Sequence, residues 1–158
     1  MVININSVYD FYSSIVLLYN YDYIYKMICG KYKYFIGLYT VLLFERIMKF
    51  LFTYVSYEIF KRPEGAYNCG LLNDGGDVSG NCGFPSGHAI STSFYFYMLF
   101  FENRIKLKKY KYYNYLLFIL IHVPIFLVSY GRIMKNCHNL FQVSGGYIFG
   151  LFFAFLFY

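Results

Sequence analysis

The sequence predicts an all-α fold, a multi-spanning transmembrane helical bundle that forms a single domain over residues 1–158. Hydrophobic residues make up 59% of the chain and charged residues only 14%, a balance far from that of soluble domains. The apolar residues gather in four stretches that approach the roughly 20 residues a helix needs to cross a bilayer. The four expected spans are residues 34–60, 88–101, 115–130 and 139–158.

A fifth helix is expected ahead of these spans, within residues 1–33. Residues 8–25 are apolar but include Asp10, Asn20 and Asp22. This segment therefore either spans the membrane or lies in its interface as an aromatic-rich helix.

The basic residues predict the orientation of the spans. The chain carries 14 Lys+Arg against 8 Asp+Glu, an excess that in a soluble protein would suggest binding to nucleic acid. Here the excess lies between apolar stretches, so we expect cytoplasmic loop anchors and no nucleic-acid partner. The loop 61–87 and the turn 131–138 would then share the exoplasmic or luminal face. The anchors are Lys26, Lys31, Lys33, Arg104, Lys106, Lys108, Lys109 and Lys111.

A basic pair, Lys61 and Arg62, followed by Pro63, ends the first apolar stretch. A guanidinium at the membrane surface is suited to bidentate contact with a phosphate. The alternative is a pair that only reaches from the helix end towards the headgroups.

A second group, Pro85-Ser86-Gly87-His88, opens the second span. The first N–H groups of a helix are unpaired and attract anions. Ser86 and Gly87 can therefore donate hydrogen bonds to a phosphate, while His88 can protonate a leaving oxygen. The alternative is an ordinary helix start with an incidental histidine.

In a third group, Arg132 is followed after five residues by His138 and after three more by Gln142. A neutral imidazole at His138 can attack phosphorus, and Arg132 can neutralise charge on the phosphoryl oxygens. Gln142, one helical turn later, can orient the ring.

In order and spacing these three groups resemble the signature of the type 2 phosphatidic acid phosphatases, the membrane lipid phosphatase branch of a superfamily that includes haloperoxidases. The resemblance covers residues 60–146. It implies a phosphatase with no metal or other cofactor, a phosphohistidine on His138, His88 as general acid, and phosphate binding by the other motif residues. Those are Arg62, Ser86, Gly87 and Arg132. Vanadium haloperoxidases share the motifs but are larger and soluble, which the spans argue against.

The expected substrate is a membrane lipid phosphate, namely phosphatidate, a polyprenyl or dolichyl diphosphate, or a sphingoid phosphate. The motifs define the reaction class, and the choice of lipid depends on the groove for the tail.

The chain departs from the family pattern at the lysine seven positions before the motif arginine, where it has Val55. Lys61 or Lys135 can replace that cation. Lys49 is set aside, because it lies nearly two turns deeper along the helix.

A second departure is Gln142, where the family has an aspartate that stabilises the charged histidine. An amide oxygen can fix the tautomer but supplies no charge, and neutralising the equivalent acid in serine hydrolases lowers turnover roughly ten-thousandfold. We therefore expect low turnover. The alternative is a catalytically impaired member that keeps the fold to bind lipid headgroups.

Weaker signals are interpreted structurally. Asp74 and Asp77 are expected to be solvated loop acids and not metal ligands, and His122 a packing residue beside Pro124. Glu45 and Arg46 are intramembrane charges and hence functional suspects, although helix pairing or a cytoplasmic position explains them equally well.

Cysteine and glycine spacing leave alternatives open. Cys69 and Cys82 flank one polar loop, so in an oxidising compartment they either pair or remain free thiols. Gly146 and Gly150 are four residues apart, a spacing that lets another helix approach within the bundle or in a homodimer.

Overall fold

The computed structural model describes residues 15, 20–55, 57–70, 74–106 and 110–158. These residues form four long helices, α2 (Tyr32–Thr53), α3 (Gly87–Lys106), α4 (Lys111–Met134) and α5 (Leu140–Phe157), and the short 3-10 helix η1 (Glu58–Phe60). Residues 20–28 are also helical. Within this part of the chain the only strand-like pairings are two isolated bridges, so the expected all-α architecture is found.

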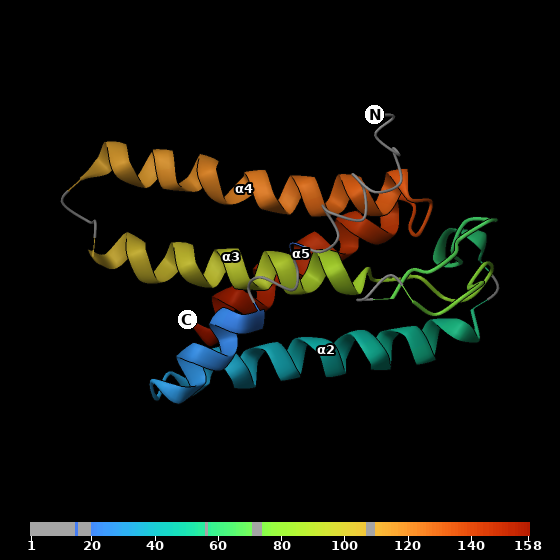
Figure 1. Ribbon diagram of the computed structural model, residues 1–158, viewed down its shortest axis with the longest axis horizontal. Helices are drawn as coiled ribbons and strands as arrows, with labels where there is room; N and C mark the ends of the chain where they lie inside the picture. Colours follow the sequence, from blue (N-terminus) through green and yellow to red (C-terminus); the bar gives the residue numbers. More distant parts are fainter. Residues whose placement is uncertain (1–14, 16–19, 56, 71–73, 107–109) are drawn as a thin grey trace, which may run out of the picture.

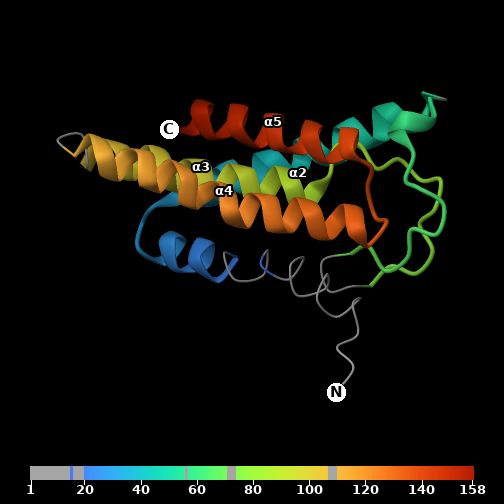
Figure 2. The same cartoon turned by 90° about the horizontal axis from the view of Figure 1, so that it is seen from above.

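The four long helices lie side by side and run in alternating directions (Figure 1). Helix α3 packs against α2, α4 and α5, most extensively against α5. Because the direction alternates, the connection from α2 to α3 and the turn from α4 to α5 meet at one end of the bundle, as Figure 2 also shows. This end carries all three groups of polar residues that the sequence singles out.

Close packing of α5 on α3 depends on two glycines. A Cβ atom on Gly146 would lie 2.8 Å from the carbonyl oxygen of Ser86, and one on Gly150 would lie 2.5 Å from that of Ile90. The four-residue spacing therefore serves packing inside the bundle. Helix α3 occupies this face of α5.

Helices α4 and α5 are long and apolar enough to cross a membrane. Only 28% of the most apolar window of each helix is buried, so their apolar side chains face outwards, unlike those of a soluble core helix. Helices α2 and α3 do not meet the same test. The four expected spans are thus supported for the last two stretches only.

The first expected span is shorter than predicted. Helix α2 ends at Thr53, and the chain turns back through η1 before it reaches Arg62. Helix α2 also carries Glu45 and Lys49 on a face that lines a cavity. Because charged residues lower the mean hydropathy of a helix, α2 is less apolar than α4 and α5.

The N-terminal helix expected over residues 8–25 lies mostly outside the described residues. In the described part, Asp22 forms an ion pair with Lys26 and accepts a hydrogen bond of 2.6 Å from the Tyr95 hydroxyl. These contacts attach residues 20–28 to α3. The side chains of the basic segment 105–109 also lie outside the described residues.

His122 is a packing residue, as expected. Its Nδ1 donates to the carbonyl of Phe118 at 2.6 Å, and its Nε2 lies 3.0 Å from the Tyr97 hydroxyl. The ring therefore cross-links α4 and α3 away from the end of the bundle that carries the motifs.

We predict that Gly150→Ala destabilises the bundle by about 1–3 kcal/mol, because its methyl group would overlap the backbone of α3. The thermal unfolding midpoint in detergent measures this, with the outward-facing substitution Ile148→Ala as control. Equal midpoints for the two variants would contradict the close approach of α5 to α3.

Candidate active site

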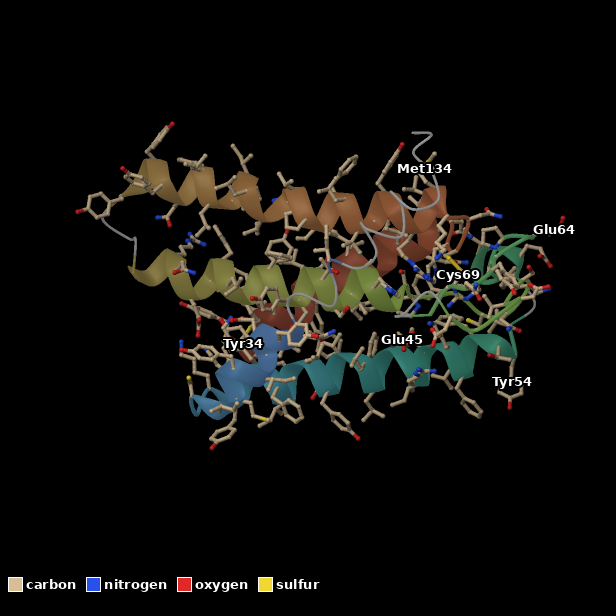
Figure 3. The ribbon with its side chains drawn as sticks, viewed as in Figure 1. Tyr34, Glu45, Tyr54, Glu64, Cys69 and Met134 are labelled. Atoms are coloured by element: carbon tan, nitrogen blue, oxygen red, sulfur yellow. A yellow bond between two sulfur atoms is a disulfide. The ribbon has the colours of Figure 1, made fainter. Side chains whose placement is uncertain are left out.

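A cavity of about 530 Å³ opens between α2, α3 and the loop that joins them. Residues from all three motifs line it: Arg62 from the loop, Gly87 and His88 from the start of α3, and His138 from the turn before α5. Figure 3 shows the polar side chains gathered at this end of the bundle, beside the labelled Cys69. The structure thus brings together side chains that are up to 76 residues apart in sequence.

The His138 ring is held by one hydrogen bond on each side. It is 2% exposed, and its Nδ1 lies 3.0 Å from the Gln142 Oε1. Because an amide oxygen only accepts, Nδ1 carries the proton and donates it. The Nε2 lone pair then faces the Arg62 guanidinium, whose Nη1 lies 3.4 Å away.

Gln142 is locked in the orientation that this tautomer requires. Its Nε2 donates to the carbonyls of Ile59 at 3.2 Å and Lys61 at 2.7 Å, so its Oε1 must point towards His138. The backbone carbonyl of Gln142 accepts from the Ser86 N–H at 3.0 Å. One fully buried residue therefore contacts all three motif segments, although it does not itself line the cavity.

Helix α5 places Gln142 through its N-terminal cap. Asn139 is the N-cap, and its side chain accepts from the Gln142 N–H at 3.0 Å in a capping box. Such a cap satisfies donors that the first turn leaves unpaired. The local sequence thus sets the position of the residue that orients His138.

A disulfide joins the loop to the turn before α5. Cys69 pairs with Cys137, and the Arg132 guanidinium donates to the Cys69 carbonyl behind the cavity. Arg62 donates from Nη1 to the Cys137 carbonyl at 3.1 Å. These contacts hold both arginines beside His138.

The suggested pairing of Cys69 with Cys82 is wrong, and Cys82 is a free thiol. The loop folds back on itself, because the Val78 N–H donates to the Ala66 carbonyl and the backbone at Cys82 forms an isolated antiparallel β-bridge with Lys61. Cys82 therefore lies near the start of the loop, while Cys69 reaches the turn before α5.

Two polar atoms at the start of α3 are buried without a hydrogen-bond partner in the described part of the chain. They are the Ser86 Oγ and the His88 Nε2. Leaving a buried polar atom unpaired costs about 1–3 kcal/mol, so each such atom needs an explanation, and a ligand or a catalytic role is one. His88 lines the cavity, and Ser86 lies just before the first turn of α3.

Lys61 does not reach the cavity, because its Nζ lies 2.7 Å from the Glu58 carboxylate on the outside of the loop. Lys49 does line it. The prediction that Lys49 lies too deep in the membrane to reach a phosphate is wrong. Glu45 on α2 lies beside the start of α3, where a Cβ on Gly87 would be 3.0 Å from its carboxylate. Lys49, one helical turn further along α2, is therefore at the end of the bundle that carries the motifs. A sequence signal for Lys49 is its spacing of four residues from Glu45.

The pKa of His138 lies well below its usual value of 6.5. Burial is the main cause, and the positive charges of Arg62, Arg132 and Lys49 add to it. The imidazole is therefore neutral near pH 7, and a neutral imidazole with an inward lone pair is a nucleophile.

The loop acids Asp74 and Asp77 have neighbours within the loop itself. Asp77 accepts from the Ser79 N–H at 2.9 Å within a turn, and Asp74 lies beside Gly70. In the residues that the structure describes, no group of three or more His, Cys, Asp or Glu side chains is arranged to hold a metal ion.

A model of the PAP2 superfamily matches residues 32–158. The chain belongs to the PAP2 superfamily. The matched range includes the three motifs and all the helices from α2 to α5, and membership supports a phosphatase. No curated protein and no solved structure matches this PAP2 chain.

We predict that Gln142→Ala lowers the thermal unfolding midpoint. It removes the hydrogen-bond partner of the His138 Nδ1 and of the Lys61 carbonyl, and it leaves the Ile59 carbonyl with the Asn139 side chain as donor. The cost is about 1–3 kcal/mol for each buried group left unpaired. Ser144→Ala, exposed on the same turn of α5, is the control. A midpoint equal to that of the control would contradict the central position of Gln142.

We also predict that the unreduced, denatured chain exposes two thiols to alkylation, Cys29 and Cys82, and the reduced chain four. Peptide mapping should place the protected pair at Cys69 and Cys137. Protection of Cys82 instead would contradict the disulfide. Reduction should also destabilise the fold by roughly 2–4 kcal/mol.

Proposed function

We propose that this PAP2 protein removes phosphate from a membrane lipid without a metal ion, through a phosphohistidine at His138. The observation that carries the proposal is the neutral, buried His138, whose Nε2 lone pair faces Arg62 in a cavity shared with His88. The same cavity continues along α2 past Leu42 to Leu38. A phosphate at one end and an apolar chain at the other match a lipid phosphate.

The phosphate would be held by cations and by the start of α3. Arg62 and Lys49 line the cavity, and Arg132 lies behind it. The unpaired Ser86 hydroxyl and the first-turn N–H groups at Gly87 add neutral donors. These groups would neutralise the phosphoryl oxygens as the transition state forms.

In the first step the Nε2 of His138 attacks phosphorus, and the bond from phosphorus to the lipid oxygen breaks. The negative charge of the bound phosphate would favour the protonated form of His88. His88 then gives its proton to the leaving lipid oxygen, which departs as an alcohol or as a lipid phosphate. Gln142 keeps the proton on Nδ1, so the lone pair stays on Nε2. Bound phosphate would take over the Arg62 donors that face this lone pair.

In the second step water attacks the phosphohistidine. His88, now neutral, takes a proton from the water. The bond from phosphorus to Nε2 breaks, which releases inorganic phosphate and the free imidazole. The electron pair returns to His138, and His88 is protonated for the next cycle.

We further propose that all four long helices cross the bilayer, with the cavity on the exoplasmic or luminal side. The outward face of α2 is apolar, with Ile36, Leu43 and Phe50 exposed, as lipid contact requires. A disulfide between Cys69 and Cys137 forms in oxidising compartments, in agreement with this orientation.

The first test of the function is phosphate release from phosphatidate in detergent with EDTA present. His138→Ala should lower release by at least about a thousandfold, and His88→Ala by roughly 10²–10⁴-fold. His122→Ala, a histidine outside the cavity, should retain activity. Equal release from the His138 and His122 variants would contradict the mechanism. No release from the wild type with any lipid phosphate would favour the headgroup-binding alternative.

The pH dependence of kcat/KM tests the state of His138. A lowered pKa means that the nucleophile is protonated only at low pH. Activity should therefore be retained at pH 6.5 and fall only at a pH well below this value. Arg62→Gln removes one cause of the lowered pKa and should move this acid limb upwards. A wild-type limb at or above 6.5 would contradict a neutral, buried nucleophile.

A further inference from the structure

Glu45 is one of two acids that line the cavity, and the other, Asp74, is exposed on the loop between α2 and α3. Glu45 is 5% exposed and lines the cavity with Lys49, to which it is ion-paired one turn along α2. Its carboxylate lies against the start of α3, where a Cβ on Gly87 would be 3.0 Å away. Figure 3 labels Glu45 on α2 near that point.

The position of Glu45 along the cavity is specific. Lys49 lies one helical turn towards the loop end, with Arg62 and His138, while Leu42 and Leu38 lie one and two turns in the opposite direction. Glu45 therefore stands between the phosphate end and the apolar end. In a bound lipid this is the place of the group that joins the reacting phosphate to the tail.

That group differs in charge between the lipid classes that the reaction admits. In a phosphomonoester of a glycerolipid it is uncharged, and in a sphingoid phosphate it carries an ammonium. In a lipid diphosphate His138 attacks the terminal phosphorus, so the inner phosphate, an anion, falls at Glu45. An anion beside a buried carboxylate is repelled, and low local polarity strengthens the repulsion.

The charges of the site agree with this selection. The cations at the cavity are Arg46, Lys49, Arg62 and Arg132, and the acids are Glu45 and Asp74, so four positive charges less two negative charges leave two. A phosphomonoester carries close to two negative charges at neutral pH, whereas a diphosphate carries more.

We propose that Glu45 is a specificity-determining residue that selects lipid phosphomonoesters, whose linking group is neutral or cationic, over lipid diphosphates. The inference rests on the proposed phosphatase function and adds the substrate class of that site. It assigns Glu45 no chemical step. Lys49 stays beside the phosphate because Glu45 holds it there.

The experiment compares kcat/KM for phosphatidate and for a polyprenyl diphosphate in wild type, Glu45→Gln and Glu45→Asp. The control is Glu58→Gln, an exposed acid outside the cavity that pairs with Lys61. Wild type should prefer the monoester, and Glu45→Gln should shift the ratio towards the diphosphate by roughly tenfold. Glu45→Asp and the control should keep the wild-type preference. The ratio is the readout because loss of the Lys49 contact lowers both rates together.

A wild-type preference for the diphosphate, or a ratio that Glu45→Gln leaves unchanged, would overturn the proposal while the phosphatase function stands. Binding provides a readout without turnover. Each of the two ligands, pyrophosphate and inorganic phosphate, should raise the unfolding midpoint. The rise with pyrophosphate relative to the rise with inorganic phosphate should be larger for Glu45→Gln than for wild type. An equal relative effect in both proteins would overturn the proposal even if neither protein releases phosphate.

Discussion

The site depends on the side-chain amide of Gln142. Its oxygen accepts from the His138 Nδ1, its nitrogen donates to the carbonyls of Ile59 and Lys61, and its backbone carbonyl accepts from the Ser86 N–H. An aspartate in this place would add negative charge near the histidine but would lose both amide donors. The carboxylate would then face the carbonyls of Ile59 and Lys61 without donating to either of them, and the Ile59 carbonyl would keep the Asn139 side chain as its donor. The chain therefore uses this position to align three segments. In the proposed mechanism the charge on the reacting histidine would be balanced by other groups, such as the bound phosphate.

Burial of several cations beside two histidines is costly unless each cation has partners. The structure supplies these from the backbone and from Glu45. Arg132 donates to the Cys69 carbonyl, and Lys49 pairs with Glu45. The disulfide keeps the Cys69 carbonyl in place by tying it to the turn before α5. The cations are thus held before a ligand arrives, which reduces the reorganisation that charge stabilisation requires.

The sequence predicted the helices and the convergence of the motifs well, because apolar runs and alternating direction determine which loops share an end. The stretches expected from 115 and 139 became α4 and α5, and Arg62, His88 and His138 line one cavity. Depth along a helix could not be predicted. The chain folds back through η1 after α2, so counting helical turns from Val55 misplaced Lys49. The disulfide was missed for a related reason, since pairing follows the path of a folded loop and not the nearest cysteine in sequence.

The central claim is that His138 becomes phosphorylated during turnover, and rapid acid-free quenching of the wild type with a lipid phosphate, followed by peptide mass spectrometry, tests it most directly. The account predicts one phosphoryl group on the peptide that contains His138, absent in His138→Ala and accumulated in a variant whose second step is slowed, such as His88→Ala with an activated leaving group. Phosphate release without any phosphorylated histidine, or with the phosphoryl group on another residue, would contradict the account.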